Sequence, residues 1–305
     1  LKHLPRNFQK IKSLRLGLEK TSIKDDHLKE IGLLFGRLKN LQTLSLSIGN
    51  NQLITDLGIS YLKMASRLLT SLKSIDIDIS LPSQREDAMN PLLFQAINPI
   101  GYNLTEKSIG FLQEILAHSG ALNKLSFRIA NNNNFFTPLI FCVSNAIKTQ
   151  QKLDELSLDL TGWTKVSIGN HFHSRPTLQR TDLTEESRIL QEALLSLHHI
   201  RSLSLIFTKS PYMTDSSVEI LTEAIRSLLS LERLHLNYQS SYEITDDSLK
   251  AIGLAIDALK GLYYLDLDFR FCKSITDKGI MYLRRGLGSL NLLLELNISL
   301  DGCPR

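Results

Sequence analysis

The sequence contains two pairs of aspartates at alternate positions, Asp76 with Asp78 and Asp266 with Asp268. Two carboxylates that point the same way can coordinate a cation or share a proton. In an extended strand, however, alternate side chains always lie on the same face, so such pairs arise wherever a polar strand face carries acids. We therefore predict that these aspartates belong to a binding face and not to a metal site or a catalytic pair.

Histidine and cysteine residues offer little further chemistry. His171 and His173 have the spacing of metal ligands, but no further ligand is near them in the sequence and four ligands are usual. The three cysteines, Cys142, Cys272 and Cys303, lie far apart without a Cys or His at zinc-site spacing, which indicates reduced thiols. The sequence shows no phosphate-binding loop, nucleophile elbow or H-E-x-x-H helix. We predict no catalytic residue, no metal site and no cofactor, and thus a protein that is not an enzyme.

The composition describes a folded chain of 305 residues, because 43% of them are hydrophobic. This excludes disordered and low-complexity chains. No apolar run approaches the roughly 20 residues of a membrane span, so we expect no membrane contact. Reduced cysteines predict a cytoplasmic location, with the cytoskeleton as one candidate site of association.

An apolar pattern, L-x-x-L-x-L-x-L, recurs nine times along the chain, for example at 41–48 and 231–238. The second apolar position recurs after 31 residues in five of the eight steps. Two longer steps indicate insertions at about 80–103 and 161–182. The period predicts that residues 1–305 form a single solenoid of about nine 31-residue repeats. Because the sequence begins within a predicted helix and ends just after a strand, we expect a section of a longer chain.

Each repeat predicts the same order of elements. Apolar and polar residues alternate in 44–48, which predicts a short strand with its leucines on one face. Apolar residues recur at helical spacing in 249–259. Strands that alternate with helices must pair in parallel, which predicts the α/β class. Between strand and helix, an apolar-Thr-acid tripeptide indicates a helix start, since Thr can cap the helix and the acid suits its dipole; it occurs at 54–56, 104–106, 183–185, 213–215, 244–246 and 275–277.

This pattern resembles that of leucine-rich-repeat proteins of the long-repeat, ribonuclease-inhibitor-like kind. The ITDxGI segments at 54–59 and 275–280 are similar to helix starts in F-box-associated repeats. The resemblance implies a horseshoe with a parallel sheet on its concave face and helices on its convex face. It implies little about function, because the family includes inhibitors, ubiquitin-ligase receptors, GTPase regulators and cytoskeletal scaffolds.

The sequence departs from the family at one position. The Asn or Cys that usually stands three residues after the third apolar position is missing from every repeat, where an additional apolar residue extends the strand. We therefore expect no asparagine ladder and a different turn after the strand, and we expect Cys272 to pack as a small apolar group.

The outward positions of the predicted strands define a candidate binding face with four basic and seven acidic residues. An acidic face disfavours nucleic acid, which needs a basic stripe, and favours a protein partner with a basic segment. The alternative is a solvated, serine-rich sheet face without a partner. Our candidate contact residues are Asp76, Asp78, Asp159, Arg233, His235, Tyr264, Asp266 and Asp268, with Tyr264 as an aromatic anchor.

Both insertions compete with this face as binding sites. Phe94 lies in an apolar cluster of the first insertion, which either folds back on the core or anchors a partner. Trp163 opens the second insertion among basic residues. We predict a protein–protein interaction scaffold within a larger assembly. The alternatives are a substrate-receptor subunit of a ubiquitin ligase, or the regulatory repeats of an enzyme, with the adaptor or catalytic domain elsewhere in the chain.

Overall fold

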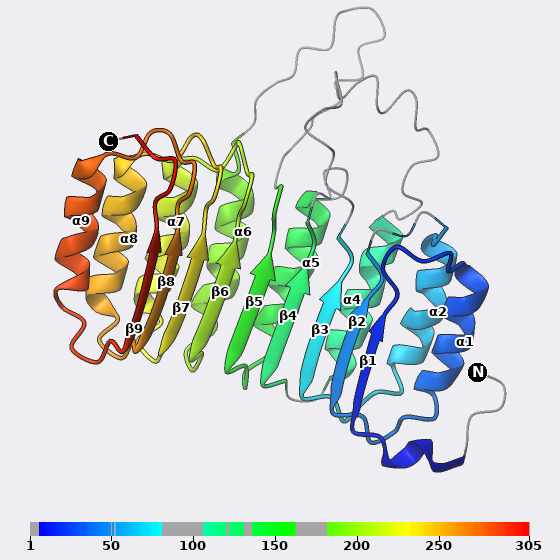
Figure 1. Cartoon of the computed structure of the whole chain (residues 1–305). Helices are drawn as coiled ribbons and strands as arrows, with labels where there is room; N and C mark the ends of the chain where they lie inside the picture. The colour runs from blue at the N-terminus through cyan, green and yellow to red at the C-terminus, as the bar shows by residue number, and fades with distance from the viewer. Residues whose placement is uncertain are drawn as a thin grey trace, which may run out of the picture. The chain divides into compact units, whose positions relative to one another are not determined.

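The computed structural model describes residues 6–49, 51, 53–80, 106–119, 122–130, 136–162 and 182–304. Nearly all of the two predicted insertions lies outside these residues, and with them Phe94, Trp163, His171 and His173. The chain forms two compact units, Leu1–Asn131 and Asn132–Arg305 (Figure 1). Among the described residues, no helix has both the length and the apolar character needed to cross a membrane.

In the first unit, strands and helices alternate as predicted. Its described elements are the short 3-10 helix η1 (Arg6–Lys10), β1 (Ser13–Gly17), α1 (Asp25–Phe35), β2 (Thr43–Ser47), α2 (Asp56–Ser66), β3 (Ser74–Asp78), α4 (Glu106–His118) and β4 (Lys124–Arg128).

The same alternation builds the second unit. Its described elements are α5 (Phe136–Lys148), β5 (Glu155–Asp159), α6 (Thr184–Leu195), β6 (Ser202–Ile206), α7 (Asp215–Ser227), β7 (Arg233–Asn237), α8 (Asp246–Ala258), β8 (Tyr264–Asp268), α9 (Asp277–Leu287) and β9 (Glu295–Ser299).

Within each unit, successive strands pair in parallel without a register shift. In the second unit Leu203 lies opposite Leu234, which lies opposite Leu265, and all three are fully buried or nearly so. Rows of this kind place the leucines on the sheet face that the helices cover, and the polar positions between them on the open face (Figure 1). The predicted α/β class and repeat-solenoid architecture are confirmed.

Four of the predicted threonine caps are confirmed. Thr55, Thr245 and Thr276 each accept a hydrogen bond from the backbone N–H two residues later, at 3.1 to 3.3 Å, and Thr214 accepts one from the N–H three residues later, at 3.4 Å. Each of these hydroxyls satisfies one N–H group that the first helical turn leaves without a partner.

The predicted cap at Thr184 is wrong. Here α6 begins at Thr184 itself, with Leu183 in the cap position and no side-chain cap. Thr184 precedes the second leucine of its strand, Leu203, by 19 residues, whereas Thr245 precedes Leu265 by 20. Because packing on the sheet fixes the register of the helix, the threonine falls one residue too late, and its buried hydroxyl has no hydrogen-bond partner among the described residues.

A ladder of mixed polar side chains follows several of the described strands, at a position where we did not predict one. Asn51 donates from Nδ2 to the Leu18 carbonyl at 2.5 Å, one repeat earlier. The equivalent residues Ser241, Cys272 and Cys303 donate in the same way to the carbonyls of Phe207, Tyr238 and Phe269, each at 3.1 Å. The strands end one residue before the extra apolar residue, although its N–H still bonds to the next repeat, as Tyr238 does to the Asp268 carbonyl at 2.8 Å. The ladder stands five instead of three residues after the third apolar position. Cys272 is therefore a hydrogen-bond donor as well as a packing group.

Candidate functional site

The acidic character of the open sheet face belongs to the second unit. The charged outward positions of the first unit are Arg15, Asp76, Asp78, Lys124 and Arg128, with a formal sum of +1. Those of the second unit are Glu155, Asp159, Arg233, Asp266, Asp268 and Glu295, with a formal sum of −4. A basic ligand segment would therefore be attracted to the second unit.

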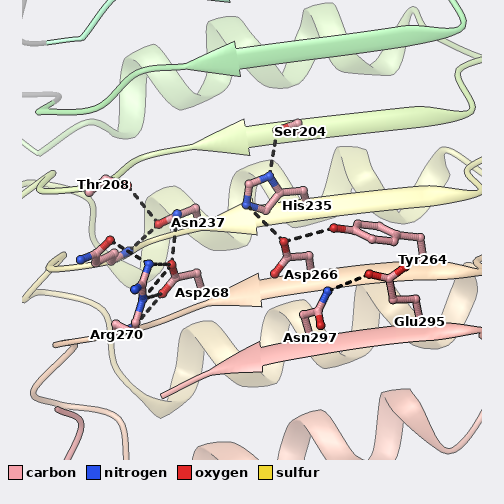
Figure 2. A network of polar contacts seen from close by, with 11 residues as sticks. Ser204, Thr208, His235, Asn237, Tyr264, Asp266, Asp268, Arg270, Glu295 and Asn297 are labelled. Carbon is pink, nitrogen blue, oxygen red and sulfur yellow. Dashed lines mark hydrogen bonds and ion pairs between the residues drawn. The ribbon is translucent and has the colours of Figure 1, made fainter. Parts of the chain in front are cut away.

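A row of hydrogen-bonding side chains crosses the middle of this face (Figure 2). Ser204, His235 and Asp266 lie opposite one another on β6, β7 and β8. The Ser204 hydroxyl is 3.1 Å from Nδ1 of His235, and His235 Nε2 is 3.8 Å from Asp266 Oδ2. All three side chains are half-buried, although none of the described helices lies on this face. Their mutual contacts hold them in place.

Serine, histidine and aspartate also form the catalytic triad of many hydrolases. The 3.8 Å separation between His235 and Asp266 exceeds a hydrogen bond. Acyl transfer also needs free N–H donors for the oxyanion, whereas β6 is paired on both sides, so its N–H groups are used in the sheet. We interpret the row as a binding surface.

Tyr264, the first residue of β8, contacts both Asp266 of this row and Arg233, the first residue of β7. Its hydroxyl donates to Asp266 Oδ2 at 3.3 Å (Figure 2). Its ring lies 4.8 Å from the Arg233 guanidinium. Burial, and then the negative charge of Asp266, raise the pKa of Tyr264. The hydroxyl therefore remains a donor at neutral pH, and the predicted aromatic anchor has a fixed orientation.

Asp268 differs from Asp266, because only 5% of the residue is exposed. Its carboxylate accepts hydrogen bonds from Arg270 Nη2 at 2.6 Å and from Asn237 Nδ2 at 3.2 Å (Figure 2). The hydrogen bond and the charge of Asp268 raise the pKa of the Arg270 guanidinium. Thr208 in turn donates to Asn237 Oδ1 at 3.0 Å. The carboxylate that we predicted to meet a partner is thus already occupied by groups of its own chain.

Asp268 also belongs to a recurring turn at the end of the strands. In this turn the last strand residue accepts a hydrogen bond from the backbone N–H two residues later, which stops the strand. The pairs are Asp78 with Ser80 at 2.9 Å, Asp159 with Thr161 at 3.1 Å, Asn237 with Gln239 at 3.0 Å and Asp268 with Arg270 at 3.0 Å. Three of the predicted contact aspartates therefore shape the turn.

The structure divides the predicted contact residues into groups. Arg233, His235, Tyr264 and Asp266 form one cluster on β7 and β8. Asp76 lies in the first unit, where its carboxylate accepts a hydrogen bond from Ser45 at 2.9 Å.

Ser204, Asn237 and Arg270 also belong to the polar network, although they were not among the predicted contact residues. Ser204 and Asn237 occupy outward strand positions, and the alignment of repeats puts them beside His235 and Asp268. That alignment was the available signal for both residues. Arg270 stands outside the strand, two residues beyond it.

Comparison with known proteins adds no family assignment. A scan against protein-family models found no match to the chain, and a search of curated proteins found none either. Among the described residues, no three His, Cys, Asp or Glu side chains are grouped so as to hold a metal ion.

Proposed function

We propose that this protein is a non-enzymatic interaction scaffold, a leucine-rich-repeat protein of the ribonuclease-inhibitor-like kind that holds a protein partner by a basic segment. The observation that carries the proposal is the open face of the second unit, where the acidic excess coincides with the fixed cluster of Arg233, His235, Tyr264 and Asp266. We further propose that it acts in the cytoplasm as part of a larger assembly.

The chemistry of the face suits a partner arginine or lysine. Glu295 is exposed beside Tyr264, its neighbour in the strand register, and Asp266 follows Tyr264 by two residues on the same face of β8. An arginine between these carboxylates would form charge-assisted hydrogen bonds and could stack on the Tyr264 ring. Because the cluster is already held by its own hydrogen bonds, little side-chain entropy would be lost on binding.

The proposal is tested with an arginine-rich peptide as the probe and a glutamate-rich peptide of equal length as the control ligand. Fluorescence anisotropy should show binding of the arginine-rich peptide only, with an affinity that falls as salt rises. The double variant Asp266→Lys/Glu295→Lys should lose this binding, and the matched variant Asp76→Lys should retain it. Equal binding to all three proteins, or to both peptides, would contradict the proposal.

A further inference from the structure

The outward face of α2 carries apolar residues where a solvent-facing helix ordinarily carries polar ones. Leu57, Met64 and Leu68 are 56%, 71% and 52% exposed. With Tyr61 they stand at positions i, i+4, i+7 and i+11, which places them in one line along the helix and its last turn. We call these four residues the α2 stripe.

Helix α1 widens this apolar surface. Leu33 of α1 is 61% exposed and occupies the position in its repeat that Met64 occupies in the next. The two helices approach closely beside it, since a side-chain carbon at Gly36 would lie only 3.4 Å from Leu68 Cδ1. The ammonium of Lys29 lies 5.7 Å from the centre of the Tyr61 ring. The stripe and Leu33 are therefore neighbours on one surface of the first unit.

Other repeats show that the fold does not require these apolar residues. The positions of Leu57, Met64 and Leu68 are taken by polar or charged residues in two helices of the second unit; the residues are Ser216, Glu223 and Ser227 for α7 and Lys278, Arg285 and Ser289 for α9. A contiguous exposed apolar surface of this kind is typical of an interaction site.

Basic side chains adjoin the stripe on both sides, whereas the acids Asp26 and Glu30 stand with Leu33 on the outward line of α1, one helix away from the stripe. Lys29 and Arg37 lie on the α1 side, Lys29 over Tyr61 and Arg37 next to Gly36. Lys63 lies on the α4 side, where a side chain at Gly110 would meet its Nζ at 2.8 Å. Arg67 is on that side too, paired with Glu114 of α4 at 2.5 Å. The partner that complements this surface is apolar along its centre and acidic along its edges.

We propose that the α2 stripe and Leu33 dock an amphipathic helix of a partner protein, with apolar residues along one face and Asp or Glu beside them. A line of apolar anchors on a helical surface matches the i, i+3, i+4, i+7 spacing of such a helix. This surface lies on the helical layer of the first unit and is independent of the open face proposed above for a basic segment.

The probe is a synthetic amphipathic helix of about 18 residues, long enough to form in water with helix-favouring residues, with leucines on one face and glutamates at its edges. A second peptide carries lysines in place of the glutamates. Fluorescence anisotropy should show that the glutamate peptide binds the protein, and Met64→Glu should reduce the affinity for this peptide about tenfold or more. Leu254→Glu on α8 changes an exposed leucine at the equivalent place in its repeat and should have no effect.

Three results would overturn the proposal: no binding of the glutamate peptide, equal binding of the lysine peptide, or binding that Met64→Glu leaves unchanged. Sedimentation of the protein alone tests whether a second copy of the chain occupies the surface. A dimer that Met64→Glu dissociates would assign the surface to self-association and not to a partner helix. Far-UV circular dichroism of both variants checks that the fold persists. Binding of the arginine-rich peptide to the open face should be the same in Met64→Glu and in the unsubstituted protein.

Discussion

The carboxylate of Asp215 at the start of α7 accepts two hydrogen bonds from Thr245, the residue that caps α8, at 2.9 Å from its N–H and 2.7 Å from its hydroxyl. The pairs Asp25 with Thr55 and Asp246 with Thr276 repeat this arrangement at 2.6 to 2.8 Å. The dipeptide Thr245-Asp246 therefore acts in two directions. Its threonine caps its own helix and donates to the preceding repeat, and its aspartate accepts from the next one.

Replacing Asp215 with alanine should destabilise the fold. The substitution removes the acceptor of the Thr245 N–H and hydroxyl and of the Ser248 N–H and hydroxyl. Urea denaturation should show a loss of about 2–3 kcal/mol in the free energy of unfolding. Asp247→Ala, at an exposed acid of the next helix, is the matched control and should cost under about 0.5 kcal/mol. Equal losses in the two variants would show that the carboxylate ladder contributes little.

The glycine of the ITDxG segment leaves room for the aspartate carboxylate of the preceding repeat, which also accepts the hydrogen bonds of the threonine. A methyl group at Gly279 would lie 2.5 Å from Asp246 Oδ1 and 2.9 Å from Leu249 Cδ2. Gly279→Ala should therefore lower the free energy of unfolding by about 1–3 kcal/mol. Gly288→Ala, at the end of the same helix, meets nothing closer than 3.5 Å and should be neutral or stabilising. The order of the two melting temperatures checks this prediction.

Tyr238 should tolerate the loss of its hydroxyl. Its ring is stacked between Phe207 and Phe269, with ring centres 5.4 and 5.9 Å away, and its buried hydroxyl has no hydrogen-bond partner in the part of the chain that the structure describes. Tyr238→Phe keeps the stack and removes the unsatisfied group, so it should raise the free energy of unfolding by up to about 1 kcal/mol. Tyr264→Phe, which breaks a bond to Asp266, should give no such gain. A Tyr238→Phe protein less stable than the parent would mean that the hydroxyl has a partner in solution.

The stability of the protein should fall at alkaline pH because of Cys272. Burial raises the pKa of this thiol from 9.0 to about 12. As pH rises through that interval, the unfolded chain loses the thiol proton before the folded chain does, so the free energy of unfolding decreases. Cys272→Ser replaces the thiol donor with a hydroxyl donor, the group that Ser241 uses one repeat earlier. The free energy of unfolding of this variant should depend less steeply on pH. Denaturant titrations from neutral pH upward compare the two slopes, and identical slopes would count against this assignment.

Asp266 and Asp268 should respond differently to alanine substitution, although they are alike in the sequence. Asp268→Ala leaves Arg270 and the Asn237 amide without their acceptor, and should cost about 1–3 kcal/mol of unfolding free energy. Asp266→Ala should change the free energy of unfolding by less than about 0.5 kcal/mol. The same substitution should weaken binding of the arginine-rich peptide. Comparable destabilisation by both substitutions would remove the distinction between a turn residue and a binding residue.

The 31-residue repeat and the alternation within strands predict the core well. Every second residue of a strand lies on the same face, so the apolar residues of each strand must face the core together. Leu203, Leu234 and Leu265 line up once 31 residues separate them. The ladder was missed because Asn51 and Cys272 stand two positions later than the family pattern places such residues, and only the backbone geometry after the strand reveals which side chain meets a carbonyl.

The occupied state of Asp268 could not be predicted from the strand pattern. It depends on Arg270, which lies outside the strand, and on Asn237 from the preceding repeat. The α2 stripe was predictable in principle, since a comparison of repeats at the outward helix positions distinguishes Met64 from Glu223 and Arg285.

The late threonine of α6 has a consequence for how the second unit comes apart. In α6, Thr184 stands at the position that Asp215 occupies in α7. Thr214 therefore meets no carboxylate at that position. The Thr214 hydroxyl lies 3.4 Å from the hydroxyl of Ser217 in its own helix. The nearest-neighbour coupling that joins α7, α8 and α9 through Asp215 and Asp246 stops short of α6. We therefore expect the coupling between α6 and α7, which Gln191 and Glu223 still link by a hydrogen bond at 3.0 Å, to be weaker than the coupling between α7 and α8. Hydrogen exchange at increasing denaturant should then show α7, α8 and α9 opening together and α6 opening separately.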